Sequence, residues 1–424
     1  MKTESRYKNK LTAESCFHLH KILDSVILIF LIVAYASVSI CEPIKNIQIF
    51  YAMALVLLSI NVIGNKSHVA FITILMMLLP IVFSDYKNFD LSKILKYESY
   101  MLTFLMVSKI KRIPVSLPLI CGATCYVHVI ITIFLFIFPS IYSIFWIVWG
   151  TNVYEHFPMG TESGTIGFRA GVTSHYSANA LYIVMAFMSI WSLYVSINEG
   201  IKKRIYLLFL FLAAFTLLLT TKRGHLIFGI LSIFIVCFYI YRKKIIPYVV
   251  KLLNYFIVLC ILLFVAYNLY TDFIGLFDRF QDASDSGRFN LWEKAFMFWT
   301  EKPLFGIGWG CFQEKYLKYD FVSYNVHNTY IQILCETGII GFMVYIFFLL
   351  NNMAKMLFCL KRIKCFCPEC RLLIKFNTAI QFFFLLYSLT GNCLYDNTLF
   401  YYAISAGVTV SLYNNFKKNE ICIK

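Results

Sequence analysis

The segment VHNTYIQILCETGIIGF places polar side chains at the start of a long apolar run. Asn328, Gln332 and Glu336 recur at a spacing of four residues, so they share one face of the predicted helix. His327 stands just before them, and a histidine near its free pKa can act as an acid or a base. Ionisable groups at the mouth of a membrane helix are costly, so a catalytic role is weighed here against a purely structural one.

A second set of candidate residues is basic and lies outside the loops that the charge pattern assigns to the cytoplasm. Lys222 and Arg223 lie in LLLTTKRGHLIFG, Arg169 ends a polar segment, and Arg288 lies in LFDRFQDASDSGRFNLWEKAF. The planar guanidinium group suits phosphate oxygens. For each arginine alone, an ion pair with a nearby acid or a lipid head group is the better explanation. The position of Lys222 and Arg223 between two apolar runs favours an anionic ligand.

Two further segments carry weaker signals. His175 lies in GFRAGVTSHYSANALYI and Asp396 in GNCLYDNTLFYYA, each at the boundary of a predicted span. Each segment either lines a cavity or caps a helix through a Ser, Asn or Asp side chain. The glycines of EKPLFGIGWGCFQEKY predict a tight turn. This turn is not a phosphate-binding P-loop, because it lacks the GK[ST] ending.

The elements that must position these residues are membrane helices. The chain has 424 residues, of which 60% are hydrophobic and 14% charged, and a soluble chain of this length needs far more polar surface. Apolar stretches of about 20 residues, the length that crosses a bilayer, recur throughout. The prediction is an all-α polytopic membrane protein with about 12 transmembrane helices. The expected spans are 22–40, 46–62, 68–84, 93–109, 115–138, 175–196, 204–220, 224–241, 247–267, 329–350, 374–390 and 394–413, with a short interfacial helix at Ile141–Trp149.

Loop charge predicts the orientation of the chain. The net charge is +16, and most lysines and arginines fall in alternate loops, which the positive-inside rule places in the cytoplasm together with both termini. This distribution explains the basic charge without nucleic-acid binding. The chain 1–424 is then a single integral membrane domain with nine spans in 22–267, a long external loop at 268–326 between the ninth and tenth spans, three spans in 327–413 and a cytoplasmic tail at 414–424. The length of the external loop indicates function.

The cysteines do not predict a metal site. Most of the 14 cysteines lie in apolar runs, where they behave as small hydrophobic residues. The exceptions are Cys365, Cys367 and Cys370 in CFCPEC, with Cys359 nearby as a fourth ligand. No second CxxC or histidine pair gives the spacing of a zinc ribbon. We therefore expect reduced cytosolic thiols, no metal and no cofactor.

Four of these stretches, taken in order, resemble the O-antigen ligase and polysaccharide polymerase superfamily of bacterial envelopes. TKRGHLIFGI is similar to its Thr-x-Arg segment, and SGRFNLWEKAFMFWTEKPLFGIGWGCF to its Arg-x-x-x-Trp and Pro-x-x-Gly-x-Gly pattern. VHNTYIQILCETGIIGF is similar to its His-Asn and Gly-x-x-Gly pattern, and the region of Asp396 completes the order. Together they cover roughly residues 165–400. The order and the His-Asn motif are the most specific features.

The resemblance implies a metal-independent membrane glycosyltransferase of the bacterial plasma membrane, with its active face outside. Such enzymes take a glycan from undecaprenyl pyrophosphate and pass it to an acceptor hydroxyl without a nucleotide sugar. By this resemblance, Arg223 and Arg288 grip the pyrophosphate, and His327 acts at the acceptor or at the phosphate. Further substrate-binding candidates are Lys222, Arg169, His175, Asn328 and Glu336. A general base, His327 or Glu336, would deprotonate the acceptor hydroxyl.

Three functions remain open at this point. The first is a polymerase that transfers a lipid-linked glycan to another lipid-linked repeat unit of a capsule, exopolysaccharide or O-antigen, with a chain-length regulator and a flippase as partners. The second is a ligase that transfers glycan to a lipid A core. The third is a transporter or flippase, which the absence of a convincing sequence repeat disfavours. The sequence does not specify the sugars, the linkage, the stereochemical outcome or the oligomeric state.

Overall fold

The computed structural model describes residues 68–83, 91–110, 115–138, 141, 169–173, 175–241, 287–321 and 324–418. Within these residues the chain forms eleven α-helices and one short 3-10 helix, which agrees with the predicted all-α class. The expected spans 22–40, 46–62 and 247–267 lie outside the described residues. So does the expected interfacial helix, apart from its first residue.

The helices keep the order of the predicted spans. Their bounds are α3 His68–Val82, α4 Leu91–Ser108, α5 Leu117–Ile137, α7 Tyr176–Tyr194, α8 Ile201–Leu219, α9 Arg223–Tyr241, α12 Arg288–Glu301, α13 Phe312–Asp320, α14 Thr329–Lys361, η5 Ile363–Cys365, α15 Pro368–Tyr387 and α16 Thr398–Lys417. Five of the described helices, namely α5, α7, α9, α14 and α15, are long and apolar enough to cross a membrane. This supports a multi-pass membrane protein.

The last three helices differ in extent from their predicted spans. Helix α14 contains 33 residues and continues beyond the predicted end at 350, because polar Asn352 is buried against Tyr402 of α16 and does not break the helix. Helix α15 begins at Pro368 rather than 374, since proline suits the first turn of a helix. Helix α16 begins at Thr398 rather than 394, where the Asp396 carboxylate accepts a hydrogen bond from the Thr398 N–H (2.8 Å).

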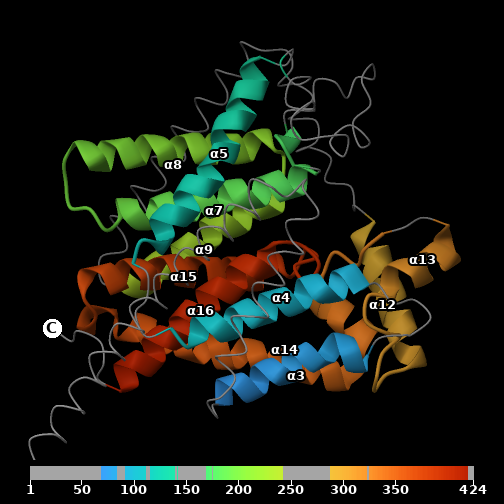
Figure 1. The fold of residues 1–424 in the computed structure, drawn as a ribbon. Helices are drawn as coiled ribbons and strands as arrows, with labels where there is room; N and C mark the ends of the chain where they lie inside the picture. Colours follow the sequence, from blue (N-terminus) through green and yellow to red (C-terminus); the bar gives the residue numbers. More distant parts are fainter. Residues whose placement is uncertain are drawn as a thin grey trace, which may run out of the picture.

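The helices form two groups that share α15 (Figure 1). Helices α3, α4, α14, α15 and α16 pack together, and α15 also packs against α7 and α9 of the group α5, α7, α8 and α9. Glycines allow close approach at these crossings. A Cβ at Gly407 of α16 would lie 2.9 Å from Val107 of α4, and one at Gly229 of α9 would lie 2.6 Å from Val184 of α7.

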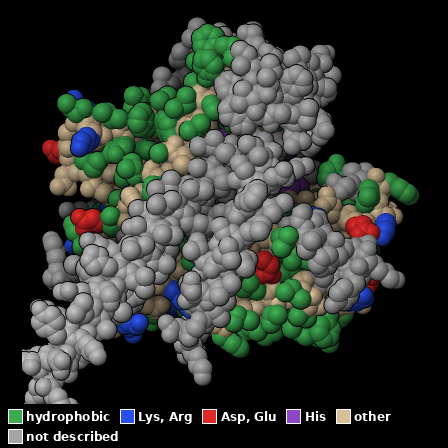
Figure 2. Space-filling model, viewed as in Figure 1, with side chains coloured by type: hydrophobic (Ala, Val, Ile, Leu, Met, Phe, Trp, Pro, Cys, Tyr) green, Lys and Arg blue, Asp and Glu red, His purple; other side chains and the backbone are tan. Residues whose placement is uncertain are grey.

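The surface agrees with this membrane-type architecture. Figure 2 shows hydrophobic side chains along the edge formed by α3 and α14, whereas charged side chains lie mainly toward the two ends of the helices. Along α14 the strongly exposed apolar residues start after residue 338 and include Ile339, Met343 and Phe347. The part of α14 before residue 338 is mostly covered by protein.

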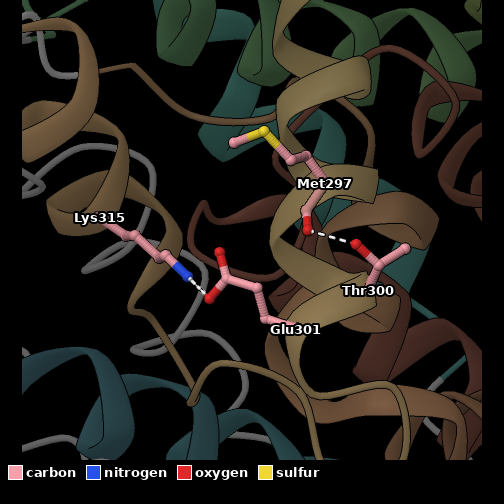
Figure 3. Close-up of polar contacts among 4 residues, drawn as sticks. All are labelled: Met297, Thr300, Glu301 and Lys315. Carbon is pink, nitrogen blue, oxygen red and sulfur yellow. Dashed lines mark hydrogen bonds and ion pairs between the residues drawn. The ribbon is translucent and has the colours of Figure 1, made fainter.

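The segment predicted as a long external loop contains helices α12 and α13. They pack on the start of α14 around a small core that includes Phe298, Phe312 and Cys335. An ion pair between Glu301 and Lys315 joins the end of α12 to α13 (Figure 3). In Figure 1 this helical pair covers one end of the bundle, which is called the α12 end below.

The α12 end is attached by a crossing of two backbone segments, 303–308 and 335–340. Gly338 interrupts α14 with φ 64° and ψ −169°, so the regular helical hydrogen-bond pattern is broken there. The freed N–H groups of Ile339 and Ile340 donate to the carbonyls of Pro303 (2.9 Å) and Leu304 (3.3 Å).

The same crossing also satisfies the carbonyls left free by the kink. The carbonyls of Cys335 and Glu336 accept from the N–H groups of Ile307 and Gly308, both at 3.0 Å. Four hydrogen bonds therefore join the two segments at the kink. This exchange allows a non-helical backbone within a long apolar helix, because buried N–H and C=O groups need partners.

We predict that Gly338→Ala destabilises the protein strongly. A Cβ at this residue would lie 2.3 Å from the carbonyl carbon of Leu304, at a backbone angle that favours glycine. The combined overpacking and strain should lower the free energy of unfolding by roughly 3–5 kcal/mol. Thermal unfolding of the purified protein in detergent measures this loss.

Gly287→Ala is the matched control, because Gly287 has φ +70° and nothing lies within 4 Å of its added Cβ. It should cost only the conformational strain of about 1–2 kcal/mol. Equal losses for the two variants would contradict the role given to the crossing.

Candidate active site at the α12 end of the bundle

His327 lies in the turn that leads into α14, in a conformation that side chains other than glycine rarely adopt. Its φ is 54°, and its backbone N–H donates to Oδ1 of Asn392 (2.9 Å). Nδ2 of the same Asn392 lies 3.3 Å from Nδ1 of the His327 ring. One asparagine thus holds both the backbone and the ring of the histidine. Strained backbone held by specific partners is typical of functional sites.

The turn that carries Asn392 also fixes the start of α14. The Thr329 N–H donates to the carbonyl of Ser388 (2.8 Å), and Oγ1 of Thr329 donates to the carbonyl of Gly391 (2.9 Å). The same hydroxyl accepts from the N–H of Cys393 (3.0 Å). The position of His327 is therefore set by the turn after α15, which is distant in the sequence.

Two predicted basic residues lie close enough to His327 to act on its charge. Burial, and then the positive charges of Arg288 and Lys222, together lower the pKa of His327 to about 4. Arg288 is the first residue of α12, and Lys222 precedes α9. The imidazole is consequently neutral near pH 7, and the positive charges of a guanidinium and an ammonium group act on it.

Lys222 joins this site to the start of α7. Its Nζ lies 4.0 Å from the centroid of the Tyr176 ring, and the His175 ring stacks on the same tyrosine at 4.2 Å. Thr221, the residue before Lys222, has φ 55°. The cation–π contact holds an ammonium group at a partly buried position. The predicted residues Lys222 and His175 are thus neighbours through Tyr176.

The structure gives His175 and Asn328 the role of helix caps. Nδ1 of His175 accepts from the Ser177 N–H (3.1 Å) at the start of α7. Oδ1 of Asn328 accepts from the N–H groups of Tyr330 and Ile331, both at 3.1 Å, at the start of α14. The sequence left a helix cap open for this segment, but from Ser, Asn or Asp, whereas the structure shows the histidine as the cap.

Glu336 is fully buried and acts as a connector between three segments. Its Oε2 accepts from the Gly310 N–H (3.0 Å) and from the Tyr395 hydroxyl (2.5 Å). Its Oε1 accepts from Nε2 of Gln332 (3.2 Å) and from the Phe312 N–H (3.4 Å). Because four donors occupy the carboxylate, the geometry favours a positioning role for Glu336 over that of a general base.

Arg223 and Arg169 belong to different elements. Arg223 is the first residue of α9 and follows Lys222 directly. Arg169 is buried, and its carbonyl accepts from Nδ2 of Asn179 on α7 (2.8 Å). The Asn179 amide also bonds to His128 and Thr132 of α5. The described hydrogen bonds therefore place the Arg169 backbone between α5 and α7.

Sequence reasoning missed three residues of this region. Asn392 clamps His327, and buried His225 stacks against Tyr387 with their ring centroids 4.3 Å apart. The Tyr387 hydroxyl lies 3.4 Å from the Ser177 hydroxyl at the start of α7, so Tyr387 borders the same site. Asn392 was detectable in principle, because the end of α15 and the start of α14 are predicted to lie on the same side of the membrane.

The cysteine segment does not form a metal site within the described part of the chain. No group of three histidine, cysteine, aspartate or glutamate side chains among these residues could hold a metal ion. Cys365 is exposed and Cys370 is buried, at the connection between α14 and α15. This connection lies at the end of the bundle opposite α12 (Figure 1).

Comparison with known proteins identifies part of the chain. Residues 208–346, which include Lys222, Arg223, Arg288, His327 and Glu336, match a family model described as O-antigen ligase. The resemblance found in the sequence is thereby confirmed over this segment. No curated protein matches the chain. The family match supports an O-antigen ligase-like activity on lipid-linked glycans in a membrane.

We predict that His327 makes the stability of the protein depend on pH between about 4 and 6.5. The lower value is the pKa of His327 in the folded chain, and the upper value is its pKa in the unfolded chain. In this interval the unfolded state binds more protons than the folded state. The stabilising contribution of neutral His327 is therefore complete above pH 6.5 and is lost as the pH falls toward 4. Unfolding temperatures of wild type and His327→Gln should differ by an amount that shrinks on acidification. A difference that does not change with pH would contradict the neutral, buried histidine.

Proposed function

We propose that this chain, which its segment 208–346 places in the O-antigen ligase and polymerase superfamily, is a bacterial surface polysaccharide polymerase. In this proposal it transfers an undecaprenyl-pyrophosphate-linked glycan to the acceptor sugar of another lipid-linked repeat unit. Capsule, exopolysaccharide and O-antigen are the candidate products. A chain-length regulator and a flippase are the proposed partners.

The observation that carries the proposal is the meeting of Arg288, Lys222 and His327 at the α12 end. These residues come from three separate segments, and both cations act on the same histidine. A glycan leaving a pyrophosphate needs stabilisation of negative charge on the departing oxygen. Guanidinium and ammonium groups fixed beside a neutral imidazole are suited to that task.

The proposed transfer exchanges one glycosidic bond for another. The bond between the glycosyl carbon and the diphosphate oxygen breaks with its electron pair on the diphosphate, and the acceptor oxygen forms the new bond to the same carbon. Arg288 and Lys222 bind the diphosphate, with Arg223 beside them at the start of α9. His327 contacts either the diphosphate or the acceptor hydroxyl. The apolar faces of the helices hold the polyprenyl chain.

Loop charge supports an external location for this site. Lys202, Lys203 and Arg204 begin α8, and the α14–α15 connection carries Arg362 and Lys364. Both connections lie at the end opposite α12 (Figure 1), and basic loops favour the cytoplasm. We therefore propose a plasma-membrane protein with cytoplasmic termini and with the α12 end outside, where a flipped lipid carrier is available.

The second candidate within the family is a ligase that transfers glycan to a lipid A core. By the family resemblance, the adjacent pair Lys222 and Arg223 is the feature that favours a polymerase. A transporter accounts less well for a histidine with two cations acting on it at the α12 end, since transporter sites lie near the middle of the membrane.

We predict that Arg288→Ala and His327→Ala abolish long-chain glycan in a deletion strain that expresses each variant at the wild-type level. Loss of transition-state charge stabilisation should lower transfer by about 100-fold or more. Gel analysis of the surface polysaccharide should show a ladder for the wild type and only single repeats for the variants.

Lys302→Ala is the matched control, because Lys302 is an exposed cation at the opposite end of α12 and should leave the ladder unchanged. A normal ladder from both site variants would refute the site. Finished polymer stranded on its lipid carrier in the deletion strain would instead identify a ligase.

A further inference from the structure

The contact between Asn392 and His327 determines which ring nitrogen carries the proton. A backbone N–H can only donate, so the Asn392 atom 2.9 Å from the His327 nitrogen must be the carbonyl oxygen Oδ1. The other end of the amide is then the NH2 group, which can also only donate. It lies 3.3 Å from Nδ1 of the His327 ring. Nδ1 must therefore accept, and the proton of the neutral ring is on Nε2.

The reversed orientation of the Asn392 amide is energetically unfavourable. Turning the Asn392 amide over would bring its NH2 group against the His327 N–H and leave two donors facing each other. A proton on Nδ1 would likewise face the NH2 group. Opposed or unsatisfied donors in a partly buried site cost on the order of 1–3 kcal/mol. One tautomer therefore satisfies both contacts at once.

We infer that Asn392 is a positioning residue that holds His327 as the Nε2–H tautomer, so that His327 donates a hydrogen bond to a diphosphate oxygen and does not deprotonate the acceptor hydroxyl. This inference rests on the proposed function for its substrate, but not for the tautomer itself. It replaces the general-base role that the sequence suggested for His327. The acceptor proton then leaves to water as the new glycosidic bond forms.

The surroundings of His327 are consistent with a site made of donors. Arg288 from α12 and Lys222 from the turn before α9 are the charged groups that act on its ring. Both oppose the gain of a further positive charge, which would accompany proton uptake by His327. His175 has the same tautomer, because its Nδ1 accepts from the Ser177 N–H. These groups together match the oxygens of a diphosphate, which only accept hydrogen bonds.

The tautomer can be measured without a substrate. Histidine labelled with ¹⁵N in the detergent-purified full chain, with the His327→Gln spectrum used for assignment, should show His327 at neutral pH with a protonated Nε2 and an unprotonated Nδ1. A wild-type ring protonated at Nδ1 overturns the inference. This measurement needs neither transfer activity nor a stable Asn392 variant, so its failure is separate from failure of the proposed function.

The variant Asn392→Asp then distinguishes a His327 that donates a hydrogen bond from a His327 that acts as a base. A carboxylate accepts from both the His327 N–H and Nδ1–H, and an aspartate at Nδ1 is the arrangement that orients a histidine as a base. If His327 is a donor, this variant should lose at least about 10-fold in transfer rate at neutral pH and should recover as the pH falls, because the imidazolium again carries a proton on Nε2. If His327 is a base, transfer should rise or persist at neutral pH and decline on acidification, which overturns the inference.

Asn290→Asp is the matched control for the added charge. Asn290 is exposed on α12, two residues after Arg288. The same substitution there should leave both the His327 signals and the pH profile of transfer unchanged. Recovery at low pH in both variants would assign the effect to general electrostatics and overturn the positioning role of Asn392.

Discussion

The arrangement of this protein at its α12 end depends on the exchange of backbone hydrogen bonds between segments 303–308 and 335–340. A helix that crosses a membrane cannot leave N–H and C=O groups without partners. The kink at Gly338 frees such groups, and the glycine-rich turn supplies their partners at 2.9–3.3 Å. Side chains cannot occupy the crossing, since a Cβ at Gly306 or Gly338 would overlap the opposing backbone. The two sequence motifs are therefore halves of one structural unit.

Glu336 extends this unit to the rest of the site. Its carboxylate binds Gly310 of the turn, Phe312 at the start of α13 and Tyr395 beyond α15. The segment around Tyr395 continues into the turn with Asn392, which clamps His327. A carboxylate buried with four donors is satisfied and holds its neighbours in place. The glutamate therefore supports the geometry of the histidine without contacting it.

Buried amides fix the helices beneath the site in a similar way. Asn397 accepts from the Tyr100 hydroxyl of α4 (2.7 Å) and donates to the Tyr182 hydroxyl of α7 (2.6 Å). These contacts tie the start of α16 to both helix groups. Gln381 of α15 donates to Thr409 of α16 (2.8 Å). Such polar contacts give membrane helices a defined register where apolar packing alone specifies it weakly.

The sequence by itself determined the helical membrane class, the order of the described helices and the set of polar segments that meet at one end. Hydropathy and local motifs suffice for these features, because they depend on near neighbours in the chain. It did not determine the helices inside the segment 268–326 or the continuation of α14 past 350. It also did not show that Glu336 has a positioning role, which differs from the role proposed for Arg288 and Lys222. Nor did it identify Asn392 as the partner of His327. These features depend on contacts between residues far apart in the chain, such as the 65 positions between His327 and Asn392, and only the packed tertiary structure decides which donors and acceptors meet.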